Sequence, residues 1–146
     1  MDAIYENNGD VNETAGDGLM VLFQDEDEKT NALQAVRTAL TIRRQTVEIC
    51  SECTSLYRPL DINMGINSGI ALVGATRFNS YTGSRWTYTA RGNVTNIAAR
   101  VGAQATRGGI YLTRSTADRI KDKHEMKSVG TLPLKNVSEP VEVYSL

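Results

Sequence analysis

Cysteine, proline and long apolar runs are all scarce in this chain of 146 residues. Its two cysteines, Cys50 and Cys53, cannot form the disulfide framework of a small secreted domain. No run reaches the roughly 18 apolar residues of a membrane span, and no basic segment followed by an apolar one opens the chain as a secretory signal does. We therefore expect a cytoplasmic location and no membrane contact by this segment.

An excess of either charge is also missing. Lysine and arginine number 16 against 17 aspartates and glutamates, for a formal net charge of −1. Nucleic-acid-binding modules normally carry a basic excess, so we expect no nucleic-acid partner. A nucleotide site needs only a few local groups and stays open. The length is typical of one domain, and the 40% hydrophobic share is ordinary for a globular one.

The first half of the chain predicts a hairpin, a long helix and two strands. Residues 10–23 indicate two short strands around Gly16-Asp17-Gly18, since Asp-Gly is a strong turn signal. Apolar residues recur at the helical period over about 26–52, after an acidic segment that suits a helix N-terminus. Residues 61–66 alternate as a half-buried strand does, and the apolar run 70–74 is typical of a buried strand.

The second half predicts a similar alternation. Residues 76–85 are polar and indicate a loop or arm, and a helix is expected to start after Gly92-Asn93. A strand is expected at 109–112, and 115–118 resembles a capping box that opens a short helix. Residues 126–146 predict two strands. Strands and helices alternate without a domain-scale break, which favours one α+β or α/β unit over residues 1–146.

Three groups of residues could carry chemistry, and each also has a purely structural interpretation. Asp17 is either an ordinary turn residue or a carboxylate held at a hairpin tip for Mg²⁺. Asn96 and Arg100 share a helix face, which is either a polar face or a pair that orients a sugar and stabilises phosphate charge. The C-x-x-C pair at 50–53 has no second pair, and the single histidine is remote, so we interpret these cysteines as structural or incidental.

The order of these segments resembles the catalytic domain of the class III nucleotidyl cyclases, the adenylate and guanylate cyclases. The resemblance runs from about residue 9 to the end of the chain. It is carried by Gly9–Phe23, Asn63–Gly69, Tyr88–Arg100 and Leu134–Val137. It implies an α+β, ferredoxin-like cyclase homology domain with a mixed, mainly antiparallel sheet and flanking helices.

The resemblance also implies roles for individual residues. Asp17 falls on the second of the family's two metal-binding aspartates, which hold Mg²⁺ or Mn²⁺. Asn96 and Arg100 fall on the catalytic pair that stabilises the transition state. Thr89 falls on a position that contacts the purine, and Lys135 falls near a lysine that contacts the triphosphate.

Glu13 does not decide whether the substrate carries adenine or guanine. Adenylate cyclases usually carry an adenine-reading lysine at this position, whereas guanylate cyclases resemble the sequence here. An ionised glutamate only accepts hydrogen bonds and so suits the N1–H and N2–H₂ donors of guanine. The Thr89 hydroxyl both donates and accepts, so ATP and GTP both remain candidate substrates.

The implied reaction is attack of the ribose 3′-hydroxyl on the α-phosphate, giving a 3′,5′-cyclic nucleotide and pyrophosphate for intracellular signalling. The family works as a head-to-tail homodimer, so Asp17 of one protomer is expected to face Asn96 and Arg100 of the other. An upstream sensor or regulatory domain is expected in a longer chain.

Family members begin with a central strand that carries the first metal aspartate. This sequence offers no counterpart, so we expect a domain that is partial at the N-terminus and inactive in isolation. The alternatives are a non-catalytic cyclase-like module that binds nucleotide, and a plain dimerisation domain.

Overall fold

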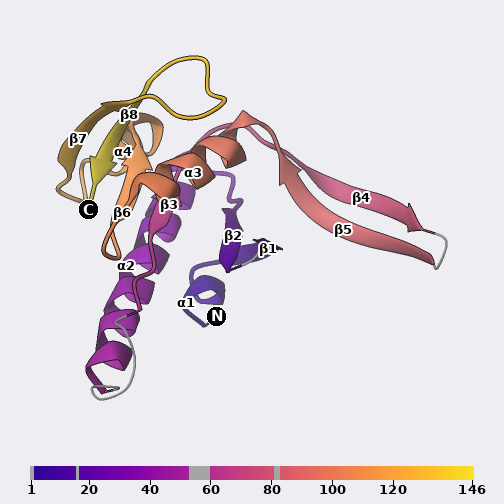
Figure 1. Cartoon of the computed structure of the whole chain (residues 1–146), viewed down its shortest axis with the longest axis horizontal. Helices are drawn as coiled ribbons and strands as arrows, with labels where there is room; N and C mark the ends of the chain where they lie inside the picture. Colours follow the sequence, from indigo (N-terminus) through magenta and orange to yellow (C-terminus); the bar gives the residue numbers. More distant parts are fainter. Residues whose placement is uncertain (1, 16, 53–59, 81–82) are drawn as a thin grey trace.

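The computed structural model describes residues 2–15, 17–52, 60–80 and 83–146, which form an α+β domain (Figure 1). The helices are α1 (Asp2–Tyr5), α2 (Glu28–Glu52), α3 (Asn93–Gln104) and α4 (Arg114–Ile120). The strands are β1 (Gly9–Ala15), β2 (Gly18–Phe23), β3 (Met64–Ile66), β4 (Leu72–Ser80), β5 (Gly83–Arg91), β6 (Ile110–Thr113), β7 (Lys127–Leu132) and β8 (Val141–Ser145). No helix in these ranges is both long and apolar enough to cross a bilayer.

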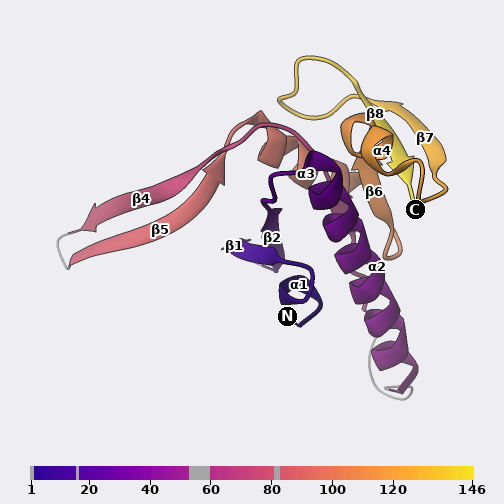
Figure 2. The same cartoon turned by 180° about the vertical axis from the view of Figure 1, so that it is seen from behind.

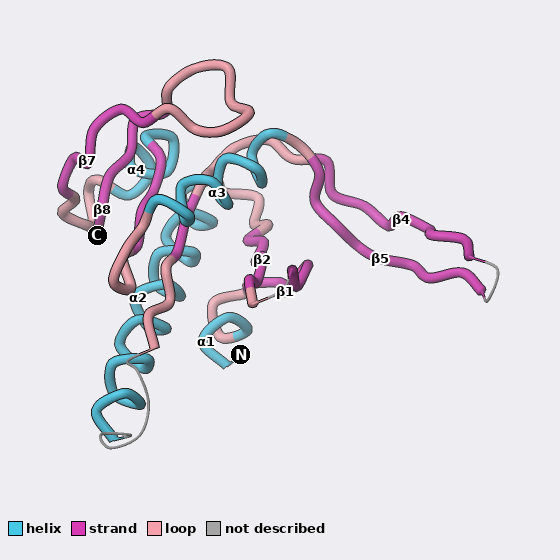
Figure 3. The backbone as a smooth tube through the Cα atoms, in the orientation of Figure 1, coloured by secondary structure: helices cyan, strands magenta, loops and turns pink. Residues whose placement is uncertain are grey.

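The described strands form a mixed, mainly antiparallel arrangement, as the sequence predicts. Strands β1 and β2 pair as an antiparallel hairpin, and so do β4 and β5 (Figure 3). The remaining four form one sheet in the order β3-β6-β8-β7 (Figure 1). Only the pairing of β3 with β6 is parallel among these ladders.

Helices cover both faces of the four-stranded sheet, α2 and α4 on one side and α3 on the other (Figures 1 and 2). Successive side chains of a strand point to opposite faces. Accordingly Leu112 of β6 packs in a cluster with residues of α2 and α4, whereas its neighbour Tyr111 packs against Val101 of α3. Leu112 and Val101 are fully buried, so this sheet forms the centre of the core.

Asp27 fixes the beginning of α2. Its carboxylate accepts hydrogen bonds from the backbone N–H of Thr30, at 2.9 Å, and from the Thr30 hydroxyl, at 2.6 Å. These bonds favour the ionised form and lower the pKa of Asp27 below its usual value. The helix therefore starts at Glu28, two residues later than the sequence predicts, because Asp27 acts as its N-terminal cap.

The region around residues 70–85 differs from the prediction. Strands β4 and β5 pair from Leu72 opposite Arg91 to Ser80 opposite Gly83, so the prediction of a polar loop there is wrong and that of an arm is closer. The strand predicted at 70–74 is present from Leu72 onwards, but the prediction that it is buried is wrong, since Ile70 is 96% exposed and Leu72 is 82% exposed. The physical reason is that the hairpin extends away from the helices and the larger sheet (Figure 1).

The start of α4 also differs. The helix begins at Arg114 with Thr113 as its N-cap, and no side chain forms a capping hydrogen bond. The predicted capping box at 115–118 is therefore wrong. The Ser115 hydroxyl instead donates to the backbone carbonyl of Ser68, at 2.9 Å, which takes it away from the helix end.

Candidate active site

Helix α3 presents two of the predicted site residues to solvent. Asn96 and Arg100 lie four residues apart, so they occupy the same face of α3. Both are exposed, and neither side chain forms a hydrogen bond or ion pair with any residue that the structure describes. Their polar groups are therefore available to a ligand, while the opposite side of the helix is held by buried Val101.

Two glycines allow α3 to lie directly on β3. A Cβ atom added at Gly65 of β3 would stand 2.2 Å from the carbonyl oxygen of Ala98 and from the backbone nitrogen of Gly102. A Cβ at Gly102 would in turn stand 2.9 Å from the backbone nitrogen of Gly65. Only glycine permits so close an approach of two backbones. These two glycines therefore set the distance between α3 and β3, and with it the position of Arg100 on α3.

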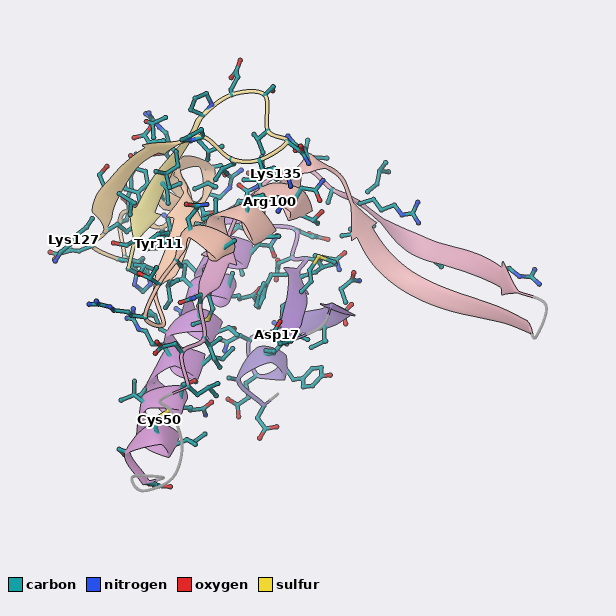
Figure 4. The ribbon with its side chains drawn as sticks, viewed as in Figure 1. Asp17, Cys50, Arg100, Tyr111, Lys127 and Lys135 are labelled. Carbon is teal, nitrogen blue, oxygen red and sulfur yellow. The ribbon has the colours of Figure 1, made fainter. Side chains whose placement is uncertain are left out.

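Lys135 lies near Arg100. Leu134 and Val101 are buried in the same hydrophobic cluster. Lys135 follows Leu134 in the chain and Arg100 precedes Val101, so both charged residues reach the surface in the region of this cluster. Figure 4 labels both residues in the same region of its view, near α3. Both are exposed, and neither has an ion-pair partner among the described residues. Two free cations so placed suit an anionic ligand such as a polyphosphate.

Asp17 belongs to a different part of the molecule. It lies between β1 and β2, whose ends pair through Ala15 and Gly18, so the predicted hairpin is present. Its side chain is exposed and free of described partners, and Figure 4 shows it well separated from Arg100. A single chain therefore does not bring Asp17 to Arg100. This separation agrees with the predicted arrangement across two protomers, which stays a prediction.

Glu13 and Thr89 lie on neighbouring strands, but their side chains fall outside the part of the chain that the structure describes. The backbone of Glu13 is opposite Met20 in β1–β2, and that of Thr89 is opposite Gly74 in β4–β5. Sequence reasoning missed Asn12, which links these strands: its side-chain oxygen accepts a hydrogen bond from the backbone N–H of Ala90, at 3.2 Å. The ladder shifts register at Asn12, and nothing in the local sequence signals that bulge.

The metal-binding potential of the described residues rests on Asp17. No group of three or more histidine, cysteine, aspartate or glutamate side chains gathers within these residues. A free carboxylate is nevertheless an appropriate ligand, since Mg²⁺ keeps several waters and commonly takes one or two protein carboxylates. Cys50, by contrast, accepts a hydrogen bond from the backbone N–H of Leu60, at 3.3 Å, in keeping with a structural role; Cys53 lies outside the described residues.

Comparison with known proteins shows the family to which this chain belongs. The family model for the "Adenylate and Guanylate cyclase catalytic domain" matches residues 1–146. The chain belongs to this family. The resemblance drawn from the sequence is thereby confirmed, together with the α+β cyclase fold.

Solved cyclases share this fold over almost the whole chain. The adenylyl cyclase CyaB from P. aeruginosa is 29% identical, with a TM-score of 0.86, over 99% of this chain and 74% of that one. The guanylyl cyclase Cya2 is 28% identical, with a TM-score of 0.80, over 99% of this chain and 72% of that one. Cyclases of both purine classes are thus about equally similar to this cyclase domain.

A curated relative is much longer. The terminal-differentiation-specific adenylate cyclase of Dictyostelium discoideum is 26% identical over 99% of this chain, which spans 7% of that protein. The similarity therefore concerns a small part of that protein and leaves its remainder unmatched.

Proposed function

We propose that this domain converts a purine nucleoside triphosphate, ATP or GTP, into the 3′,5′-cyclic nucleotide and pyrophosphate, as part of intracellular signalling in the cytoplasm. The observation that supports this most strongly is the exposed pair Asn96 and Arg100 on a rigidly seated α3, next to Lys135, in a chain of the cyclase family. Nucleotide cyclisation needs groups of this kind, because negative charge develops at the α-phosphate during the reaction.

In the proposed reaction, the 3′-oxygen of the ribose forms a bond to the α-phosphorus, and the bond from that phosphorus to the bridging oxygen breaks. The hydroxyl proton passes to solvent water, and pyrophosphate leaves with the bridging oxygen. Arg100 offsets the charge that develops on the α-phosphate, and Asn96 orients the ribose. Lys135 binds the triphosphate. Since the attack is intramolecular, holding the ribose in the correct orientation contributes as much as charge stabilisation.

Asp17 is proposed to help hold Mg²⁺ or Mn²⁺, as its free carboxylate allows. Divalent ions, when bound, lower the pKa of the 3′-hydroxyl and neutralise the leaving pyrophosphate. Because Asp17 and Arg100 lie apart within one chain, we propose that they meet across a head-to-tail homodimer, which has two equivalent sites.

Complementation between two inactive variants tests this proposal. Asp17→Asn and Arg100→Ala are expected to lower turnover by at least about 10²-fold each. Both residues are exposed, so neither variant should lose stability. Arg37→Ala, at an exposed arginine of α2, is the matched control and should retain turnover. Cyclic nucleotide is measured with ATP and with GTP, in the complete translated protein.

The decisive result comes from mixing the two variants. If the sites lie between protomers, random assortment should restore about a quarter of the wild-type turnover, because each mixed dimer keeps one intact site. No recovery would refute the head-to-tail arrangement. Saturable triphosphate binding by a wild-type protein without turnover would support a non-catalytic nucleotide-binding module instead.

A further inference from the structure

The side chain of Asn67 lies just beyond the end of β3 and connects three elements. Its amide nitrogen donates a hydrogen bond to the carbonyl oxygen of Val94 in α3, at 3.0 Å. Its side-chain oxygen accepts a hydrogen bond from the Thr113 hydroxyl, at 2.7 Å. The Ser115 hydroxyl lies 3.1 Å from the same oxygen, but its single proton is donated to the Ser68 carbonyl. A backbone carbonyl only accepts, so the nitrogen must face Val94, and the Thr113 hydroxyl can satisfy the oxygen. The orientation of the amide is therefore fixed.

Asn67 stands in a row of residues that supports α3. Gly65, Asn67 and Gly69 all lie against this helix. A Cβ at Gly65 would collide with the backbone of Ala98 and Gly102, and one at Gly69 would lie 3.1 Å from the Val94 side chain. The glycines allow close contact with α3 but form no side-chain hydrogen bond to it. The Asn67 side chain forms such a bond, to the Val94 carbonyl in the first turn of the helix.

The position of this bond matters for the predicted site. Val94 is the second residue of α3, and Asn96 lies two residues further along. A carbonyl in a helix keeps a second lone pair after its backbone bond, so Val94 can accept from Asn67 without loss of the helical ladder. Rotation or translation of the first turn would carry Asn96 and Arg100 with it.

We propose that Asn67 is a positioning residue for the cyclase reaction: by binding the Val94 carbonyl, it fixes the first turn of α3 and so the placement of Asn96 and Arg100 on the substrate. This inference rests on the proposed function. A displacement of about 1 Å at reacting groups can cost about 10²-fold in rate. The loss should therefore exceed what weaker folding alone produces.

Three variants test the proposal. Asn67→Asp keeps the size of the side chain and the acceptor for Thr113 but places an oxygen against the Val94 carbonyl. Asn67→Ser is uncharged and too short to reach that carbonyl. Thr113→Val is the matched control, because it removes a hydrogen bond from the other side of Asn67 and leaves the amide N–H free to bind Val94.

The measurements are kcat, KM, thermal stability and hydrogen exchange of the amides in residues 94–100, in the complete protein. Both Asn67 variants should lower kcat by about 10–100-fold, leave KM within about threefold, and speed amide exchange in the first turns of α3. Thr113→Val should lower the melting temperature but keep kcat and the exchange rates of these amides.

Unchanged kcat and exchange in folded Asn67 variants would overturn the proposal. An equal fall of kcat in Thr113→Val would also overturn it, since the effect would then reflect the stability of the whole network. If both Asn67 variants fail to fold while Thr113→Val folds, Asn67 holds the fold rather than the site, and the proposal fails. A wild-type protein without turnover would refute the proposed function, and the exchange rates alone would then show whether Asn67 holds α3.

Discussion

Replacing Gly65 by alanine tests most directly how α3 is placed. The added Cβ would meet the carbonyl oxygen of Ala98 and the nitrogen of Gly102 at 2.2 Å, whereas ordinary contact begins at 3.4 Å. Both atoms belong to backbone, so no side-chain rotation relieves the clash, and α3 must move by about 1 Å. Such overpacking typically costs about 1–3 kcal/mol of stability. A movement of this size also predicts a fall in turnover of about 10²-fold.

The assay combines thermal denaturation with cyclic-nucleotide turnover in the same preparation. At roughly 2–4 °C per kcal/mol for a domain of this size, Gly65→Ala should lower the melting temperature by about 2–12 °C. Gly74→Ala is the matched control for stability, because a Cβ at Gly74 meets nothing within 4 Å. A Gly65→Ala protein with wild-type melting temperature and turnover would refute the close contact between β3 and α3.

Three further outcomes are expected. Leu112→Ala, at a fully buried position, should lower the free energy of unfolding by about 2–5 kcal/mol in chemical denaturation. The hydrogen bond from the Thr30 hydroxyl lowers the pKa of Asp27. The ionised Asp27 therefore stabilises the fold above the unfolded pKa of 3.8, and this stabilisation is lost as the pH falls from that value through the folded pKa. Asp27→Asn keeps the helix cap and should flatten this loss of stability in acid. If Glu13 accepts hydrogen bonds from guanine, Glu13→Lys should move the ratio of kcat/KM for GTP over ATP towards ATP by at least about tenfold, and an unchanged ratio would exclude Glu13 as a purine contact.

Much of the fold could be predicted from the sequence because its elements follow simple periodicities. The long helix α2 has bounds close to those expected, and the two strands expected within residues 126–146 are present as β7 and β8. The β4–β5 hairpin was missed because many of its residues are polar, and because Leu72 at the start of β4 is exposed, as is Ile70 before it. A hydrophobic pattern predicts a strand because buried residues alternate with exposed ones. A hairpin that extends away from the core buries few residues, so the pattern does not reveal it.

The catalytic candidates came from resemblance rather than from periodicity. Spacing alone placed Asn96 and Arg100 on one face, and the structure adds why that face is rigid. For Asp17, the sequence identified the hairpin, but the separation from Arg100 depends on how distant elements pack. The proximity of Lys135 to Arg100 likewise depends on the contact of Leu134 with Val101, which joins segments more than thirty residues apart in the sequence.

Asn67 shows why residues that position a site are harder to find than residues that form it. In the sequence, Gly65, Asn67 and Gly69 alternate with larger or more apolar neighbours, a pattern typical of a strand with one solvent-facing side. The structure shows the reverse: this small and polar side faces α3, because backbone contact replaces side-chain packing there. A prediction from the pattern of apolar and polar residues considers only the polarity and size of the side chains. It therefore assigns the side that carries Gly65, Asn67 and Gly69 to solvent. The close backbone contact at Gly65 and the bond from Asn67 to the Val94 carbonyl identify this side as the support of the helix that carries Asn96 and Arg100.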